Sequence, residues 1–257
     1  MKRTIEFRFY AELNDFLPKE RKQRSFARRL SGDASVKDLI ESQGIPHTEI
    51  ALVLVDGRPV DFSHLVRGSV RISAYPQFAS IEISSLSFLR PPLPREPRFV
   101  LDVHLGKLTR YLRLLGFDCL YRNDRTDAEL VRIASAEGRI LLTRDVGVLM
   151  RAAVLHGYWL RQTEARKQVR EVLRRFDLSA RIAPFTRCLR CGGFLQPVGK
   201  TEVEDRLPPR AACAFDRFVR CAGCAKIYWQ GSHYDRMARF VESLRGSQKH
   251  AGMGGGG

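Results

Sequence analysis

The sequence predicts a chain of mixed α/β structure with more than one domain. Residues 1–80 alternate short apolar strands around one helix, residues 98–176 repeat strand and helix units, and two C-x-x-C pairs follow. The chain has 257 residues, of which 44% are hydrophobic, so it is long enough for one or two domains and too apolar for intrinsic disorder. We therefore expect a small α+β domain, then a parallel sheet with flanking helices, then a cysteine-rich module.

The first 80 residues alternate apolar and polar side chains, which is typical of half-buried strands. Expected strands include residues 5–9, 51–55 and 70–75. One helix is expected after Ser35, whose hydroxyl stands three residues before Asp38 as in a capping box, and Gly44 can end it. The order strand, strand, helix, strand, strand predicts a β-grasp fold.

This segment resembles the ubiquitin-like sulfur-carrier proteins of thiamine and molybdopterin synthesis, through SVKDLIESQGIPHTEIALVLVDGRPVDF and VRISAYPQF. Carriers of that family end in Gly-Gly, whereas this segment continues into Ala79, Ser80 and Ile81. The continuation argues against sulfur transfer, and a role as an adaptor in sulfur or ubiquitin-like conjugation is the least favoured hypothesis. The resemblance implies a protein partner for this domain.

Four prolines within residues 90–97 predict an extended spacer before the second part of the chain. From residue 98 apolar strands alternate with amphipathic helices, which implies a parallel sheet with helices on both faces. Strands are expected at residues 99–101, 117–121, 140–142 and 158–160. Helices are expected at residues 105–115, 127–137, 146–156 and 164–176.

Three aspartates stand where chemistry is expected in such a fold, beyond the carboxyl ends of the strands. Asp102 follows the first strand, Asp145 follows the strand that begins at Ile140, and Asp127 begins the intervening helix. Carboxylates at one edge repel one another unless a cation lies between them, and hard oxygen ligands suit Mg²⁺ or Mn²⁺. The alternative is that Asp127 and Asp145 only cap helices and that Asp102 only ends a strand.

The blocks FVLDVHLGKLTRYLRLLGFD and DAELVRIASAEGRILLTRD resemble the PIN-like ribonuclease domain named from the carboxy-terminal part of the Mut-seven exoribonuclease. The resemblance extends over about residues 99–244. It implies that Asp102, Asp127 and Asp145 hold the catalytic Mg²⁺ or Mn²⁺. PIN nucleases commonly have a fourth acid, whereas the segment after Asp145 reads VGVL and has none.

The implied reaction is hydrolysis of an RNA phosphodiester by metal-activated water. Lys107, Arg110 and Arg144 lie next to the aspartates in sequence and are candidate phosphate contacts. The alternative for all three is a solvated helix face, which explains Arg110 equally well.

Two cysteine pairs, Cys188 with Cys191 and Cys221 with Cys224, have the spacing of a tetrahedral structural zinc site. Redox activity of a C-x-x-C motif is the competing interpretation, and two pairs in one chain favour zinc. The 29 residues between the pairs exceed the usual ribbon spacing, so an insertion is expected there.

The segment after the second pair, residues 227–237, interleaves aromatic and basic side chains. Such side chains can stack on unpaired bases. Tyr228 and Trp229 can equally pack the ribbon against the α/β body, and this is the preferred interpretation. His233 is a candidate substrate contact through the family resemblance alone.

The formal net charge is +16, and about half of it lies in residues 151–200. An arginine-rich composition also arises from a GC-rich genome, so this excess indicates a polyanionic partner without proving one. No uncharged apolar run reaches the roughly 18 residues of a transmembrane helix, and the N-terminus does not have the pattern of a secretory signal. We expect no membrane association and a cytoplasmic location.

Together these observations predict a metal-dependent ribonuclease whose ribbon and arginine-rich helix bind RNA. The alternative is a non-catalytic RNA- or ribosome-binding zinc-ribbon module. The sequence makes no prediction of the oligomeric state. The expected divisions are a ubiquitin-like β-grasp domain at 1–80, a Pro-rich linker at 81–97, a PIN-like nuclease domain at 98–180, a zinc ribbon and closing segment at 181–245, and a disordered Gly-rich tail at 246–257.

Overall fold

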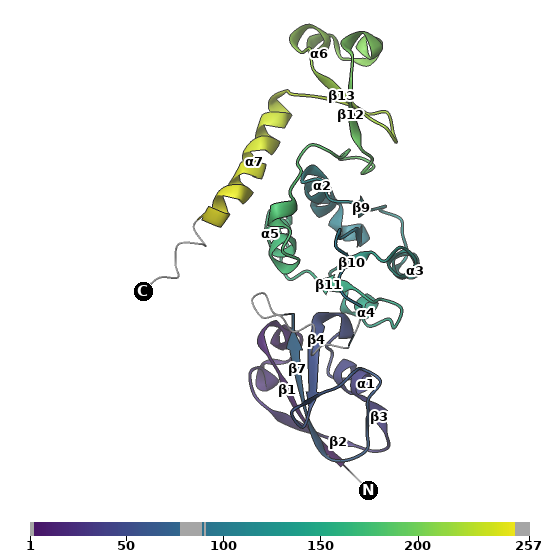
Figure 1. The fold of residues 1–257 in the computed structure, drawn as a ribbon, viewed down its shortest axis with the longest axis vertical. Coiled ribbons are helices and arrows are strands. Elements are labelled where there is room, and N and C mark those ends of the chain that lie inside the picture. The colour runs from purple at the N-terminus through teal and green to yellow at the C-terminus, as the bar shows by residue number, and fades with distance from the viewer. Residues whose placement is uncertain (1–2, 78–88, 90, 250–257) are drawn as a thin grey trace. The chain divides into compact units, whose positions relative to one another are not determined.

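A computed structural model describes residues 3–77, 89 and 91–249 (Figure 1). Much of the expected linker and the tail from residue 250 onward lie outside the described residues. The chain forms two compact units. The first unit comprises Met1–Asp102 and Arg125–Arg161, and the second comprises Val103–Asp124 and Gln162–Gly257.

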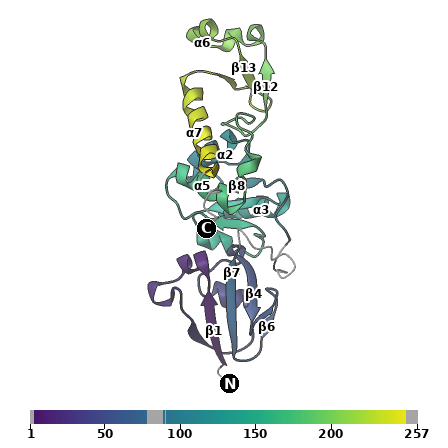
Figure 2. The ribbon, with the colours of Figure 1, turned by 60° about the vertical axis from the view of Figure 1, so that its left-hand side comes forward.

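The first unit begins with a five-stranded sheet of order β2-β1-β7-β4-β5. Its strands are β1 (Arg3–Phe9), β2 (Phe26–Leu30), β4 (Ile50–Val55), β5 (Arg58–Pro59) and β7 (Val70–Pro76). The central strands β1 and β7 are parallel and lie beside β4 in Figure 2, while the other pairs are antiparallel. Ile5, Phe7 and Phe9 are all buried, so the alternation in the sequence correctly predicted which face of β1 points into the core.

The helix α1 (Val36–Glu41) packs its apolar residues into the same core. The Ser35 hydroxyl accepts a hydrogen bond of 3.1 Å from the main-chain N–H of Asp38, which is the cap that the sequence predicted. A short pair of strands, β3 (Ala34–Ser35) and β6 (Leu65–Val66), completes this part. The β-grasp prediction is confirmed.

The first unit also holds a parallel sheet of three short strands, β8 (Phe99–Leu101), β10 (Ile140–Thr143) and β11 (Gly157–Trp159). β10 lies between the other two and pairs with both. Every residue of β8 and β10 is buried, as expected for parallel strands that are covered on both faces. The helix α3 (Asp127–Glu137) packs against β8 and β10 and has the bounds that the sequence predicted.

One predicted helix is shorter than expected. α4 spans Val146–Leu149, whereas the sequence pattern predicted a helix over 146–156. The chain turns after Met150, and the N–H of Val154 donates to the carbonyl of Arg151. The carbonyl of Val154 in turn lies 2.9 Å from Nε2 of His47 in the β-grasp part, a contact that no local pattern indicates.

The second unit contains α2 (Gly106–Leu114), β9 (Cys119–Leu120) and α5 (Ala165–Arg175), and α2 packs against α5. An antiparallel ribbon of order β12-β13-β14 follows, built from β12 (Leu195–Val198), β13 (Phe218–Cys221) and β14 (Ile227–Trp229). The expected insertion lies between β12 and β13 and carries α6 (Pro209–Ala214), which Figure 1 shows beside the ribbon. The helix α7 (Ser232–Lys249) closes the unit and runs four residues into the segment expected to be a tail.

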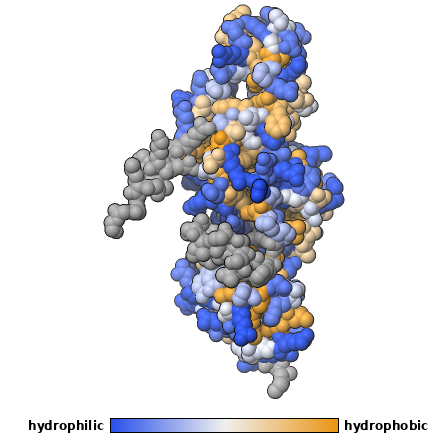
Figure 3. Space-filling view, in the orientation of Figure 1, coloured by the Kyte–Doolittle hydropathy of each residue, from blue (hydrophilic) through white to orange (hydrophobic). Residues whose placement is uncertain are grey.

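No helix within the described part of the chain has the length and apolar character that crossing a bilayer requires. The face of the molecule in Figure 3 is mostly hydrophilic, with hydrophobic patches that include part of the lobe carrying β12 and β13. Phe194, which precedes β12, is 60% exposed.

Candidate active site and metal centre

Asp102 lies directly beyond β8, at the carboxyl edge of the parallel sheet. It is only 7% exposed, and its main-chain N–H donates to the carbonyl of Leu142, which extends the pairing with β10 by one residue. Its carboxylate accepts a hydrogen bond of 2.7 Å from the hydroxyl of Thr143. The carboxylate is therefore held in a fixed position at the end of the two central strands.

The Thr143 hydroxyl connects two of the predicted aspartates. It donates to Asp102 and accepts a hydrogen bond of 2.9 Å from the main-chain N–H of Asp145. Thr143 itself is fully buried. Its role was not predicted, because a threonine at the end of an apolar strand is an ordinary strand residue in the sequence.

Asp145 is the N-cap of α4. Its Oδ1 accepts a hydrogen bond of 2.7 Å from the N–H of Gly147, so the capping role considered from the sequence is present. The residue is exposed, and its other carboxylate oxygen has no hydrogen bond from the described residues. One oxygen can therefore orient the side chain while the other remains available to a ligand.

Asp127 is the first residue of α3 but does not cap it. Thr126 is the N-cap, and it forms a capping box with Glu129 through hydrogen bonds of 3.3 and 2.8 Å. Asp127 is exposed, and its carboxylate has no hydrogen bond or ion pair with the described residues. The alternative that Asp127 caps α3 is therefore wrong, and the part that Glu129 plays in the cap was not predicted.

The candidate phosphate contacts lie on different elements. Arg144 is exposed between Thr143 and Asp145, and its carbonyl accepts a hydrogen bond of 3.2 Å from the indole N–H of Trp159. In the second unit, Lys107 and Arg110 are exposed on α2, and His233 is exposed in the first turn of α7.

The four predicted cysteines form a cluster in the second unit that could hold a metal ion. All are free thiols, and their Sγ atoms lie within 4.8 Å of one another. The Sγ atoms of Cys191 and Cys221 lie 3.4 Å apart, and those of Cys188 and Cys224 lie 3.6 Å apart. A tetrahedral site with Zn–S bonds of about 2.3 Å places its sulfurs about 3.8 Å apart, so this geometry fits Zn²⁺.

Among the described residues, this cysteine cluster is the only group in which three or more metal-ligating side chains gather around one point. Asp102, Asp127 and Asp145 do not form a cluster of this kind.

The surroundings of the cluster are suited to thiolates. The main-chain N–H groups of Gly223 and Cys224 point at Sγ of Cys221 at 3.3 and 3.4 Å, and the Tyr228 hydroxyl lies 3.1 Å from Sγ of Cys188. Burial raises the pKa of the Cys188 thiol, but hydrogen bonds from Tyr228 and nearby main-chain N–H groups outweigh it and lower the pKa to about 6. Burial raises the pKa of Cys191 to about 12. A Zn²⁺ ion favours the thiolate form of all four.

Arg113 joins the first cysteine pair to α2 and was not predicted. It is 3% exposed, and its guanidinium donates to the carbonyls of Cys119 at 2.8 Å and Arg190 at 2.7 Å. The only signal in the sequence is a charged residue between Leu112 and Leu114 on the apolar side of an amphipathic helix. This residue fixes the loop that carries Cys188 and Cys191.

Taken together, the fold and the site define a mixed α/β protein, with a β-grasp part before a parallel sheet flanked by helices and a tetracysteine ribbon in its C-terminal part. Two family models match the chain. The Mut7-C RNase domain matches residues 97–241, which is more than half of the chain, and the Mut7-C ubiquitin domain matches residues 2–82. The chain therefore belongs to the Mut7-C RNase family, as the sequence motifs predicted. No curated protein and no solved structure matches it.

Proposed function

We propose that this protein is a divalent-metal-dependent ribonuclease that hydrolyses RNA phosphodiesters at the edge formed by Asp102 and Asp145. The observation that carries this proposal is the Thr143 hydroxyl, which connects both aspartates at the carboxyl ends of neighbouring parallel strands. The Mut7-C RNase match supports the reaction class.

The three aspartates have different roles in this proposal. Asp102 is buried and fixed, which suits an anchoring ligand. Asp145 has one oriented but open oxygen, and the exposed Asp127 has both oxygens open. They would hold Mg²⁺ or Mn²⁺, which supplies activation of the attacking water and neutralises charge on the phosphate. Asp127 would have to turn toward the other two, because the three do not already form a cluster.

The remaining predicted residues have supporting roles. We propose that Arg144, Lys107, Arg110 and His233 contact the RNA, and that the four cysteines hold a structural Zn²⁺ ion. A protein partner for the ubiquitin-like domain, the domain boundaries predicted above and a cytoplasmic location also stay predictions.

Cleavage assays of purified full-length protein test the function. We expect cleavage of single-stranded or structured RNA with Mg²⁺ or Mn²⁺, and a loss of at least a hundred-fold in Asp102→Asn and Asp145→Asn. Asp216→Asn is the matched control, because Asp216 is an exposed acid in the ribbon insertion and pairs with Lys200 at 3.0 Å.

The opposite result would support the second candidate function. If the protein cuts neither substrate, or if the Asp102 and Asp145 variants cut as well as the wild type, a non-catalytic RNA-binding module explains the chain better. The absence of an acid after Asp145 and the capping role of that residue favour this alternative. It predicts salt-sensitive RNA binding that does not change when Mg²⁺ is omitted.

A further inference from the structure

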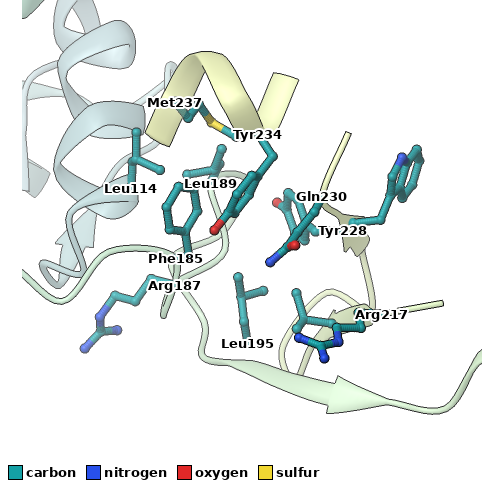
Figure 4. Close-up of a pocket in the computed structure, with 12 residues that line it drawn as sticks. Leu114, Phe185, Arg187, Leu189, Leu195, Arg217, Tyr228, Gln230, Tyr234 and Met237 are labelled. Atoms are coloured by element: carbon teal, nitrogen blue, oxygen red, sulfur yellow. The ribbon is translucent and has the colours of Figure 1, made fainter. Parts of the chain in front are cut away.

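The second unit contains an open cavity that is distinct both from the sheet edge where Asp102 and Asp145 lie and from the cysteine cluster. It has a volume of about 170 Å³ and lies between the ribbon, the loop before the ribbon and the start of α7 (Figure 4). We call it the ribbon pocket. The side chains that matter for its chemistry are Phe185, Arg187, Arg217, Tyr228, Gln230 and Tyr234.

Two aromatic rings form a platform in the ribbon pocket. Phe185 and Tyr234 have ring centroids 4.4 Å apart and planes inclined by 31°, and both are half-buried. Phe185 has φ of 61°, a left-handed backbone conformation that is costly for a bulky residue. Its main-chain N–H nevertheless donates to the carbonyl of Leu114, so the end of α2 holds the backbone that carries the ring.

The cysteine cluster orients a third ring. Tyr228 also lines the pocket, and its hydroxyl is bound at Sγ of Cys188. The aromatic walls are therefore set before any ligand arrives, which lowers the entropy cost of binding a flat ring.

The polar side chains of the pocket are basic or neutral, and none of the described residues that line it is acidic. Arg187 is fixed by the carbonyls of Gly116 at 3.0 Å and Gly192 at 2.9 Å. Arg217 is exposed and has no ion pair with any described residue. Gln230 extends among the labelled side chains of Figure 4, with an amide that offers a donor and an acceptor.

We propose that the ribbon pocket binds one unpaired base of single-stranded RNA. The base would stack on the Phe185 and Tyr234 platform and pair its edge with the amide of Gln230, while Arg217 contacts a neighbouring phosphate. Aromatic stacking beside arginine and amide side chains is how proteins recognise unpaired RNA bases. The absence of acidic lining residues suits an anionic backbone. This inference rests on RNA being the substrate in the proposed function.

The test measures RNA affinity in full-length protein that also carries Asp102→Asn, so that bound RNA stays intact. Fluorescence anisotropy with a labelled single-stranded RNA of mixed sequence is compared with a duplex RNA of the same length. We expect Tyr234→Leu to weaken single-strand binding about ten-fold and to leave duplex binding unchanged. Tyr234→Phe keeps the ring and should restore the wild-type affinity.

Arg217→Ala is compared with Arg210→Ala, which removes the same charge from an exposed position on α6 outside the pocket. We expect a several-fold loss and a shallower salt dependence only for Arg217→Ala. Thermal melting and zinc content of each variant show whether the ribbon is intact.

Two results would overturn the pocket assignment and leave the ribonuclease proposal standing. One is unchanged single-strand affinity in Tyr234→Leu, which would leave the cavity to a protein or peptide ligand. The other is an equal loss for the duplex. If the protein carrying Asp102→Asn binds no RNA at all, and the wild type does not cleave RNA, both proposals fail.

Discussion

The buried carboxylate of Glu49 accepts a hydrogen bond of 2.6 Å from the main-chain N–H of Trp159. Glu49 belongs to the β-grasp part, and Trp159 ends β11 of the nuclease sheet. Trp159 is paired in register with Thr143, and its indole N–H reaches the carbonyl of Arg144. The ubiquitin-like domain therefore supports the strand next to the one that carries the candidate active site.

Replacing Glu49 tests this support. Glu49 is 1% exposed and pairs with Arg161 at 3.4 Å. Glu49→Ala therefore removes a negative charge that neutralises the largely buried guanidinium of Arg161. It also leaves the main-chain N–H of Trp159 without its carboxylate acceptor. We expect the free energy of unfolding to fall by about 3 kcal/mol in urea titrations.

The matched control is Asp15→Asn, which removes the more exposed acid bound to the same arginine at 2.8 Å. It should cost about 1 kcal/mol or less. Equal losses in the two variants would contradict the importance of Glu49.

Replacing Thr143 tests the link between the two aspartates. Thr143→Val keeps the shape of the side chain but removes the hydroxyl that Asp102 and Asp145 share. We expect RNA cleavage to fall at least ten-fold and stability to fall by about 1 to 3 kcal/mol. Thr143→Ser retains the hydroxyl and should keep most of the activity, whereas wild-type cleavage by Thr143→Val would show that the link is dispensable.

Local patterns predicted the elements well where capping and periodicity agree. α3 has its predicted bounds because Thr126 and Glu129 cap its start and Gly138, with φ of 59°, ends it in the left-handed conformation. The pattern after Asp145 predicted too long a helix, because it could not show that the Val154 carbonyl meets His47.

For the candidate site, the periodicity of the strands predicted where Asp102 and Asp145 lie but not the residues that contact them. Asp102 and Asp145 follow apolar strands, so periodicity indicated their edge of the sheet. Thr143, Arg113 and Glu49 act through contacts with distant or main-chain groups, and buried polar residues of this kind leave no periodic signal.

The cysteine cluster predicts the zinc content of the protein. We expect one Zn²⁺ per chain by elemental analysis, and its loss in Cys191→Ser together with melting of the ribbon at lower temperature. Cys213→Ser is the matched control, because Cys213 is an exposed free thiol outside the cluster. Full zinc content in Cys191→Ser would contradict a site built from four thiolates.

The environment of His47 predicts a loss of stability at acidic pH. Burial lowers the pKa of His47, and the charge of Lys37 lowers it further, against the opposing effects of Glu41 at 2.6 Å and the Val154 carbonyl. The folded protein then binds fewer protons than the unfolded chain below the unfolded pKa of about 6.5. The contribution of neutral His47 to the free energy of unfolding is therefore complete above the unfolded pKa, and it is lost as the pH falls through the folded pKa.

Urea titrations at pH 8 and pH 5.5 measure this effect. The decrease in the free energy of unfolding between the two values should be smaller in His47→Gln, which cannot take up the proton. His64→Gln is the control, because His64 is an exposed histidine of the same domain and its replacement should leave the decrease unchanged. An unchanged pH dependence in His47→Gln would show that protonation of His47 does not govern the contact between the β-grasp part and the loop at Val154.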